Sequence, residues 1–145
     1  MKVREILRQK GPEVFTIGED KPVFDAMRVL VNNRVGALLV LNSDAKIVGI
    51  LSERDIVRFA FEDIESIKER QVKEIMTKNL LIVEPNDDIE YVESIMTQNK
   101  VRHLPVVSDK ILIGIISIGD IVKTKFKHIS AENKYLRDYI EGGLA

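Results

Sequence analysis

Hydrophobic and polar positions follow one another along the chain in a pattern that predicts two kinds of element. Apolar residues spaced three and four positions apart predict one helix in each half of the chain. These apolar positions are Val23, Met27 and Leu30 in the first half and Ile89, Val92, Ile95 and Met96 in the second.

Runs of apolar, mostly β-branched residues predict the strands. A short run precedes each helix, at residues 14–17 and 80–83, and two longer runs joined by a polar turn follow it. A second helix is predicted to begin at about Glu53 in the first half and at about Ile118 in the second. The order strand, helix, strand, strand, helix therefore occurs twice.

The sequence itself repeats in the register of these elements. Three segments of the first half return in the second with similar residues, which indicates an internal duplication. They are Val3–Leu7 with Val72–Met76, Asn33–Leu41 with Asn99–Val107, and Gly49–Val57 with Gly114–Val122. The last pair shares the motif Gly-x-x-Ser-x-x-Asp-Ile-Val. The chain is therefore predicted to contain two copies of one small unit.

Composition narrows the class of protein. The chain has 145 residues, 45% hydrophobic and 31% charged, which suits a soluble protein with its own core. It has no cysteine, so disulfides and thiolate metal sites are excluded. The longest apolar run, residues 35–41, is too short to span a membrane, and the charged residues after Met1 do not fit a signal peptide. We therefore expect a cytoplasmic protein without membrane association, and the net charge of -1 argues against nucleic acid as a partner.

The repeated motif lies where a strand is predicted to pass into a helix. This places Ser52 and Ser117 at the helix N-caps and Asp55 and Asp120 in the first turns. One interpretation is structural, because serine is a preferred N-cap and an acidic residue complements the helix dipole. The other is functional, because a helix start can hold a phosphate and a carboxylate can accept both hydroxyls of a ribose. The two are compatible, and the recurrence of the glycine and of Ile-Val favours binding in addition to capping.

No group of residues in the sequence assembles an active site. Residues 114–121 have the glycine spacing of a phosphate-binding loop, but Asp and Ile stand where Lys and Ser or Thr belong. His128 lies in a lysine-rich stretch without acidic neighbours, and the adjacent carboxylates Asp87 and Asp88 point to different faces. We therefore expect no catalytic residues, no metal ligands and no enzymatic cofactor.

The two units, with the segment His103–Val107 and the two Gly-x-x-Ser-x-x-Asp-Ile segments, resemble a tandem pair of CBS domains, often called a Bateman module. The resemblance covers roughly residues 1–125. It implies an α/β (α+β) fold in which two pseudo-twofold related β-α-β-β-α units pack through their small sheets and leave a cleft. We expect one unit at 1–65, the second at 66–125 and a C-terminal helical tail at 126–145, whose Tyr135, Leu136, Tyr139 and Ile140 could pack on the body or on a partner.

Modules of this family typically bind adenosine-containing ligands such as AMP, ADP, ATP or S-adenosylmethionine. In the family the aspartate of the motif holds the ribose hydroxyls and the serine contacts ribose or phosphate, which the resemblance carries over to Asp55, Asp120, Ser52 and Ser117. The adenine lies against the first strand and the residues just before the second. The matching residues are Thr16, Ile17, Val35 and Ala37 in the first unit and Ile82, Val83, Val101 and His103 in the second.

The two predicted sites differ in charge. Arg102 and His103 stand where the first unit has Gly36 and Ala37, so only the second unit offers cations there for a phosphate. Conversely, Arg54 of the first unit has a glycine as its counterpart. A single histidine before an apolar strand can also be a bystander, so both interpretations of His103 stay open.

The sequence thus predicts a ligand-sensing regulatory module that binds an adenine nucleotide and relays its state to an effector protein. The alternative is a structural or assembly protein whose Ser-x-x-Asp motifs are only helix caps; an enzyme subunit acting on nucleotides has no residues to support it. The helices after the motifs carry more apolar surface than one chain covers, which predicts a homodimer. These apolar residues are Ile56, Val57, Phe59, Ala60 and Phe61 in the first unit and Ile121, Val122 and Phe126 in the second.

Overall fold

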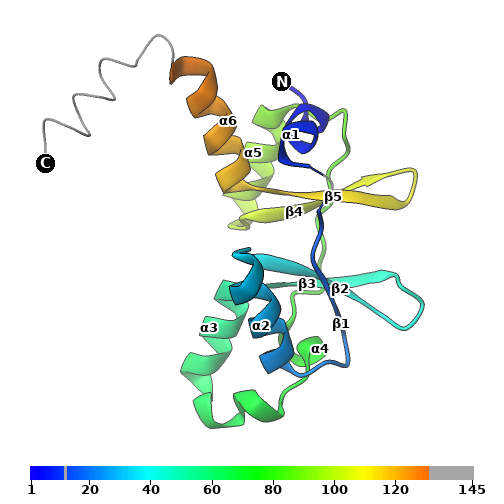
Figure 1. Cartoon of the computed structure of the whole chain (residues 1–145), viewed down its shortest axis with the longest axis vertical. Helices are drawn as coiled ribbons and strands as arrows, with labels where there is room; N and C mark the ends of the chain where they lie inside the picture. Colours follow the sequence, from blue (N-terminus) through cyan, green and yellow to red (C-terminus); the bar gives the residue numbers. More distant parts are fainter. Residues whose placement is uncertain (12, 131–145) are drawn as a thin grey trace, which may run out of the picture. The chain divides into compact units, whose positions relative to one another are not determined.

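The computed structural model describes residues 1–11 and 13–130. The chain divides into two compact units (Figure 1). Of the described residues, unit 1 combines 1–11 with 83–130, and unit 2 comprises Glu13–Ile82. Each unit is a small sheet with helices on one of its faces.

Unit 2 contains a three-stranded sheet in the order β1-β2-β3. β1 and β2 run parallel, with α2 as the crossover, and β2 and β3 form an antiparallel hairpin. The elements are β1 (Thr16–Gly18), α2 (Val23–Asn33), β2 (Ala37–Leu41), β3 (Ile47–Ser52), α3 (Glu53–Glu62), the 3-10 helix η1 (Ile64–Glu69) and α4 (Val72–Ile75).

The core of unit 2 lies between this sheet and its helices. Successive side chains of a strand point to opposite faces, so Leu38 and Val40 of β2 reach the helices together. They join a buried cluster whose other members are Val23, Ala26, Leu30, Leu51, Ile56 and Val72. Ala37 and Leu39, on the other face of β2, are buried as well. The continuous apolar run of this strand therefore reflects burial on both faces.

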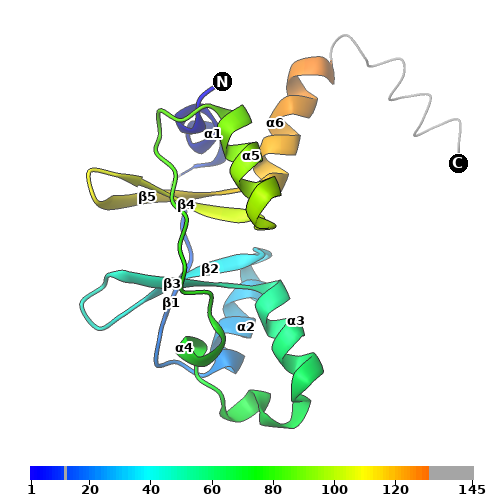
Figure 2. The same ribbon diagram turned by 180° about the vertical axis from the view of Figure 1, so that it is seen from behind.

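Unit 1 repeats the arrangement with a two-stranded antiparallel sheet. Its elements are α1 (Val3–Lys10), α5 (Ile89–Asn99), β4 (His103–Ser108), β5 (Ile111–Ser117) and α6 (Ile118–Ser130), seen from behind in Figure 2. The core cluster contains Val3, Ile6, Val83, Ile89, Val92, Met96, Leu104, Val106, Ile116 and Ile121.

The predicted elements are found in the predicted order, with one reduction and with three further helices, α1, η1 and α4, that the sequence pattern did not predict. Residues 80–83 were predicted as a strand, but only Val83 pairs, as a single parallel bridge to Val106. Leu81 and Ile82 are exposed, so burial does not favour an extended pairing there. The predicted tail begins inside α6, which runs without a break from Ile118 to Ser130. Tyr135, Leu136, Tyr139 and Ile140 lie outside the described residues.

The compact units differ from the predicted boundaries at 1–65 and 66–125. The leading helix of each repeat packs with the body of the other repeat: Val3 and Ile6 of α1 are buried in unit 1, and Val72 of α4 is buried in unit 2. The physical reason is that each leader buries its apolar residues under a sheet that its own repeat does not supply. None of the helices in the described part of the chain has an apolar stretch long enough to cross a bilayer.

Candidate functional site

In unit 2 the motif forms a reciprocal capping box at the start of α3. Ser52 has extended backbone angles, with φ -106 and ψ 163, and its hydroxyl accepts from the Asp55 N–H at 3.2 Å. The Asp55 carboxylate oxygen Oδ2 accepts from the Ser52 N–H at 2.9 Å and from the Ser52 hydroxyl at 3.0 Å. This satisfies two backbone donors that a helix start would otherwise leave unpaired.

Unit 1 repeats this geometry at the start of α6. The Ser117 N–H donates to Asp120 Oδ2 at 2.9 Å, and the Asp120 N–H donates to the Ser117 hydroxyl at 3.0 Å. The capping role predicted for both serines is therefore confirmed.

Each carboxylate also binds a residue from a leader segment far away in the sequence. In unit 2 the hydroxyl of Thr77, just after α4, donates to Asp55 Oδ1 at 3.2 Å. In unit 1 the ammonium of Lys10, the last residue of α1, donates to Asp120 Oδ2 at 2.8 Å. Sequence reasoning missed both residues. The repeat of the leader segments could be recognised in the sequence, but the sequence did not show against which unit each leader packs.

The glycine of the motif has a packing role. A Cβ built on Gly49 would stand 2.5 Å from Sδ of Met76 and 3.0 Å from the backbone oxygen of Thr77. A Cβ on Gly114 would stand 2.9 Å from Cδ2 of Leu7. The repeated glycine is therefore explained by close approach of a leader segment to the strand. It is not, as the sequence suggested, an independent indication of binding.

The predicted site residues of unit 2 gather around the β2–β3 end. Ala37 pairs with Ser52, and Thr16 of β1 pairs with Leu39 two residues further along β2. Ile17 and Val35 are half-buried against the core. Arg54 follows the cap in the first turn of α3 and is exposed.

Of the ligand residues predicted for the second repeat, two lie beside the start of α6 and the others lie elsewhere. His103 pairs with Ser117, and the Arg102 carbonyl accepts from the Ile118 N–H at 2.9 Å, so both cationic candidates stand beside the start of α6. Val101 is half-buried and Ile82, at the edge of unit 2, is 53% exposed.

Val83 stands apart from the other predicted site residues. Its side chain is 1% exposed, and its N–H and carbonyl are bonded to Pro105 and Val107. Val83 thus belongs to the core of unit 1, and its backbone N–H and carbonyl each already have one hydrogen-bond partner.

Unit 2 also has an open pocket of about 440 Å³ between α2, the start of β2 and the start of α3. Its lining consists of Met27, Leu30, Val31, Arg34, Val35, Gly36, Glu53, Ile56 and Val57. Of these residues only Val35 belongs to the predicted ligand residues, and neither Ser52 nor Asp55 lines the pocket, although Glu53 between them does. No cluster of histidine and acidic side chains suited to a metal ion occurs among the described residues.

Comparison with known proteins identifies the family. The family model described as "CBS domain" matches residues 3–62 and 72–127. The chain belongs to the CBS-domain family. The two matched segments are the two sequence repeats, and the CBS-pair fold predicted from the motifs is confirmed.

Similar proteins include CBS-domain proteins from several organisms. The "CBS domain-containing protein CBSX3, mitochondrial" of Arabidopsis thaliana is 36% identical over 149 residues, which cover 97% of this chain and 72% of that protein. The crystal structure of the CBS-domain containing protein ATU1752 from Agrobacterium tumefaciens is 35% identical, with a TM-score of 0.83 over 86% of this chain and 92% of that chain. The CBS domain pair of protein MJ0100, in complex with 5-methylthioadenosine and S-adenosyl-L-methionine, is 22% identical, with a TM-score of 0.77 over 88% of this chain and 98% of that one.

Proposed function

We propose that this CBS-domain protein is a non-catalytic, ligand-sensing module that binds an adenine nucleotide at its Ser-x-x-Asp motifs and relays the bound state to an effector protein. The observation that carries the proposal is the state of Asp120. Its Oδ2 is fixed by the Ser117 N–H and the Lys10 ammonium, while Oδ1 accepts no hydrogen bond from any described residue. A half-buried carboxylate held in place with one oxygen available is suited to accept ribose hydroxyls.

The surroundings of Asp120 suit the rest of a nucleotide. The Arg102 side chain is exposed, and it makes no hydrogen bond or ion pair with a described residue. A guanidinium in that state can take up a phosphate with charge-assisted hydrogen bonds. The complex of the MJ0100 domain pair with two adenosine-containing compounds supports this ligand class for the fold.

The alternative, a structural protein with capping motifs only, is favoured by one specific observation. Asp55 already has both oxygens engaged, Oδ2 with Ser52 and Oδ1 with the Thr77 hydroxyl. Capping and leader anchoring account for every contact that Asp55 makes with described residues. The two interpretations therefore differ most clearly in unit 1.

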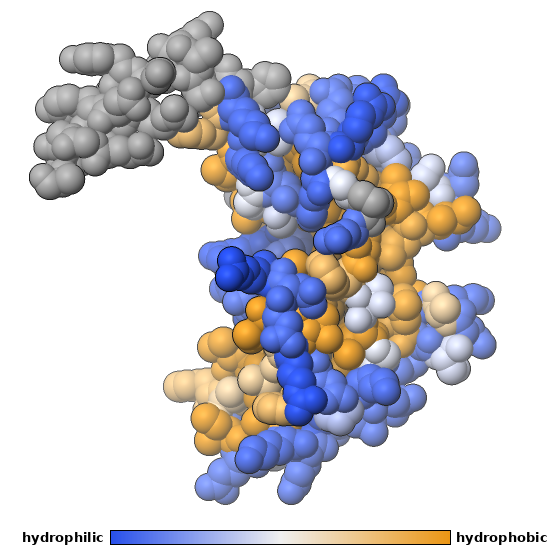
Figure 3. Space-filling view, in the orientation of Figure 1, coloured by the Kyte–Doolittle hydropathy of each residue, from blue (hydrophilic) through white to orange (hydrophobic). Residues whose placement is uncertain are grey.

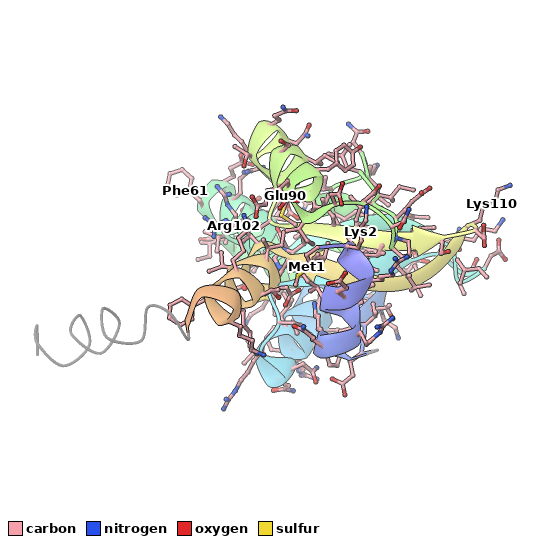
Figure 4. The ribbon with its side chains drawn as sticks, turned by 90° about the horizontal axis from the view of Figure 1, so that it is seen from above. Met1, Lys2, Phe61, Glu90, Arg102 and Lys110 are labelled. Atoms are coloured by element: carbon pink, nitrogen blue, oxygen red, sulfur yellow. The ribbon has the colours of Figure 1, made fainter. Side chains whose placement is uncertain are left out.

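We also propose that the protein forms a homodimer, separately from its contact with the effector protein. Apolar side chains gather over α2 and α3 of unit 2 (Figure 3). Val57 and Phe61 of α3 are 67% and 92% exposed, and Figure 4 shows Phe61 pointing away from its helix. In unit 1, Val122 and Phe126 of α6 are 59% and 46% exposed. Exposed apolar side chains of this kind mark interaction sites, and in a twofold homodimer the same patch of each chain meets its copy.

Thermal unfolding with AMP, ATP, adenosine and S-adenosylmethionine tests the proposal. A ligand at about 100 times its Kd adds about 2.7 kcal/mol to the free energy of unfolding, which raises the melting temperature by several degrees. Such a rise with at least one of these compounds, and none with GMP, is the expected result. An unchanged melting temperature with all of them at millimolar concentration would leave the structural interpretation.

A further inference from the structure

The ammonium of Lys10 joins two groups of unit 1 that lie more than one hundred residues away in the sequence. It donates to Asp120 Oδ2 at 2.8 Å and to the Ile115 carbonyl at 2.9 Å. The side chains of Lys10 and Asp120 are 30% and 21% exposed. A lysine ammonium has three donors, so one N–H of Lys10 is left without a partner among the described residues.

In unit 2 the equivalent carboxylate and backbone carbonyl accept hydrogen bonds from uncharged donors. Ile50 holds the position of Ile115, since each follows the glycine of its motif. The Thr77 N–H donates to the Ile50 carbonyl at 2.9 Å, and the Thr77 hydroxyl donates to Asp55 Oδ1 at 3.2 Å. One ammonium in unit 1 thus replaces a backbone amide and a hydroxyl in unit 2, which adds a positive charge beside the carboxylate.

The charge of the residues around the two motifs differs in the same direction, more positive in unit 1 than in unit 2. The leader donor is Lys10 in unit 1 and the uncharged Thr77 in unit 2. Arg102 of unit 1 stands where unit 2 has Gly36, and between the serine and the aspartate of the motif unit 2 has Glu53 and Arg54 where unit 1 has the uncharged Ile118 and Gly119. Unit 1 therefore has two cations and one carboxylate there, and unit 2 has one cation and two carboxylates. Because these groups are partly exposed, their effect on a ligand is moderate, but its sign is opposite in the two units.

We propose that Lys10 is an anion-binding residue of the unit 1 site, where it selects an adenosine ligand carrying a 5′-phosphate, whereas the unit 2 site selects an adenosine compound without negative charge. The proposal rests on the proposed function and assigns a ligand charge to each of its sites. Lys10 keeps its bonds to Asp120 and Ile115, and its remaining N–H donates to the phosphate beside the Arg102 guanidinium. The ribose hydroxyls use Asp120 Oδ1.

Titration calorimetry with AMP and adenosine as probes tests this role. The Asp55→Asn variant serves as the parent, because it weakens the unit 2 site and isolates the site of unit 1. Lys10→Met is expected to lower the affinity for AMP by about tenfold and to change the affinity for adenosine by less than about twofold. Lys10→Arg is expected to restore most of the preference for AMP.

Lys2→Met is the matched control. Lys2 precedes the same helix and pairs with Asp88 at 2.8 Å, so the variant removes an equal charge and an equal ion pair away from the motif. It is expected to leave both affinities unchanged. In the converse parent, Asp120→Asn, which leaves the unit 2 site, adenosine is expected to bind more tightly than AMP.

The possible failures are distinguishable. An equal loss of both affinities in Lys10→Met would show that Lys10 only positions Asp120, and a gain for both probes would show that it competes with the ligand. Either result overturns this proposal and leaves the proposed function intact. Binding of neither probe to the unmutated chain would overturn both.

Discussion

Met76 lies so close to Gly49 that a Cβ on the glycine would stand 2.5 Å from the methionine sulfur. The same Cβ would also stand 3.0 Å from the backbone oxygen of Thr77, which is held by the pairing of Thr77 with Ile50. At Gly114 the three nearest atoms all belong to the side chain of Leu7, the closest being Cδ2 at 2.9 Å, and none is backbone. A side-chain end can move at lower cost than a bonded backbone group.

This difference predicts a ranking of glycine substitutions. Gly49→Ala is expected to lower the free energy of unfolding by about 1–3 kcal/mol, because the added methyl overpacks a site in which the Met76 side chain can shift but the hydrogen-bonded Thr77 oxygen cannot. Gly114→Ala is expected to cost less, since Leu7 can adopt another rotamer. Urea unfolding of the variants measures the costs.

Gly119→Ala is the control for this ranking. A Cβ on Gly119 would stand 3.6 Å from the Ser117 hydroxyl, an ordinary contact, and alanine is the better residue inside a helix. Its stability is expected to equal or exceed that of the parent. A loss at Gly119 as large as that at Gly49 would contradict the packing explanation.

The sequence was sufficient for the elements and the repeat, because both depend on local patterns. The helix starts predicted at about Glu53 and about Ile118 follow from the serine caps and are confirmed. The exchange of leader helices was not predictable in the same way. Val3 and Val72 are apolar in either arrangement, and only the three-dimensional path of the chain determines which sheet each one covers.

The site shows the same division between local and distant contacts. The two residues of each Ser–Asp box are three positions apart, and their capping role was predicted from this spacing and from the residue types. Lys10 and Thr77 reach their carboxylates from far away in the sequence, and nothing in their own neighbourhoods marks them. Val83 was assigned to a ligand site by the resemblance, but its place in the core follows from its bridge to Val106.

The exposed apolar side chains of α3 and α6 predict a homodimer. Light scattering at micromolar concentration is expected to give about twice the chain mass of 16.5 kDa. Replacing Val57 and Phe61 by Lys and Glu is expected to yield monomer, because charged side chains would be buried without partners.

Ile111→Glu is the matched control for the interface. Ile111 is 65% exposed but begins β5, in the hairpin whose turn carries Lys110 (Figure 4), rather than lying on α3 or α6. Its dimer content is expected to equal that of the parent. A parent protein that scatters as a monomer would contradict the predicted homodimer.

Glu74 predicts an acid-dependent contribution to stability. The Gln71 N–H donates to its carboxylate at 2.6 Å, and this bond, with a further one from Arg70, holds the pKa of Glu74 below its usual range. Because the pKa is lowered in the folded state, the carboxylate stabilises the fold above its unfolded pKa of about 4.3. That stabilisation is lost as the pH falls through the folded pKa.

Melting temperatures measured from about pH 7 down to about pH 3 check this effect. Glu74→Gln is expected to melt below the parent at neutral pH and to approach it in acid. Glu65→Gln, an exposed carboxylate in η1, is expected to follow the parent throughout. A constant difference between Glu74→Gln and the parent over the whole range would contradict the assignment.

The central claim is that the motif aspartates bind ligand in addition to capping helices, and calorimetric titration of AMP into Asp55→Asn, Asp120→Asn and the double variant tests it most directly. Asparagine keeps an acceptor for the cap, so each change is expected to cost no more than about 1 kcal/mol of stability. An amide presents only one acceptor oxygen to a ribose diol, so AMP affinity at the altered site is expected to fall by about ten- to a hundredfold, with Asp44→Asn in the β2–β3 turn unchanged. Full AMP affinity in a folded double variant would contradict the account and leave Ser-x-x-Asp as a helix cap.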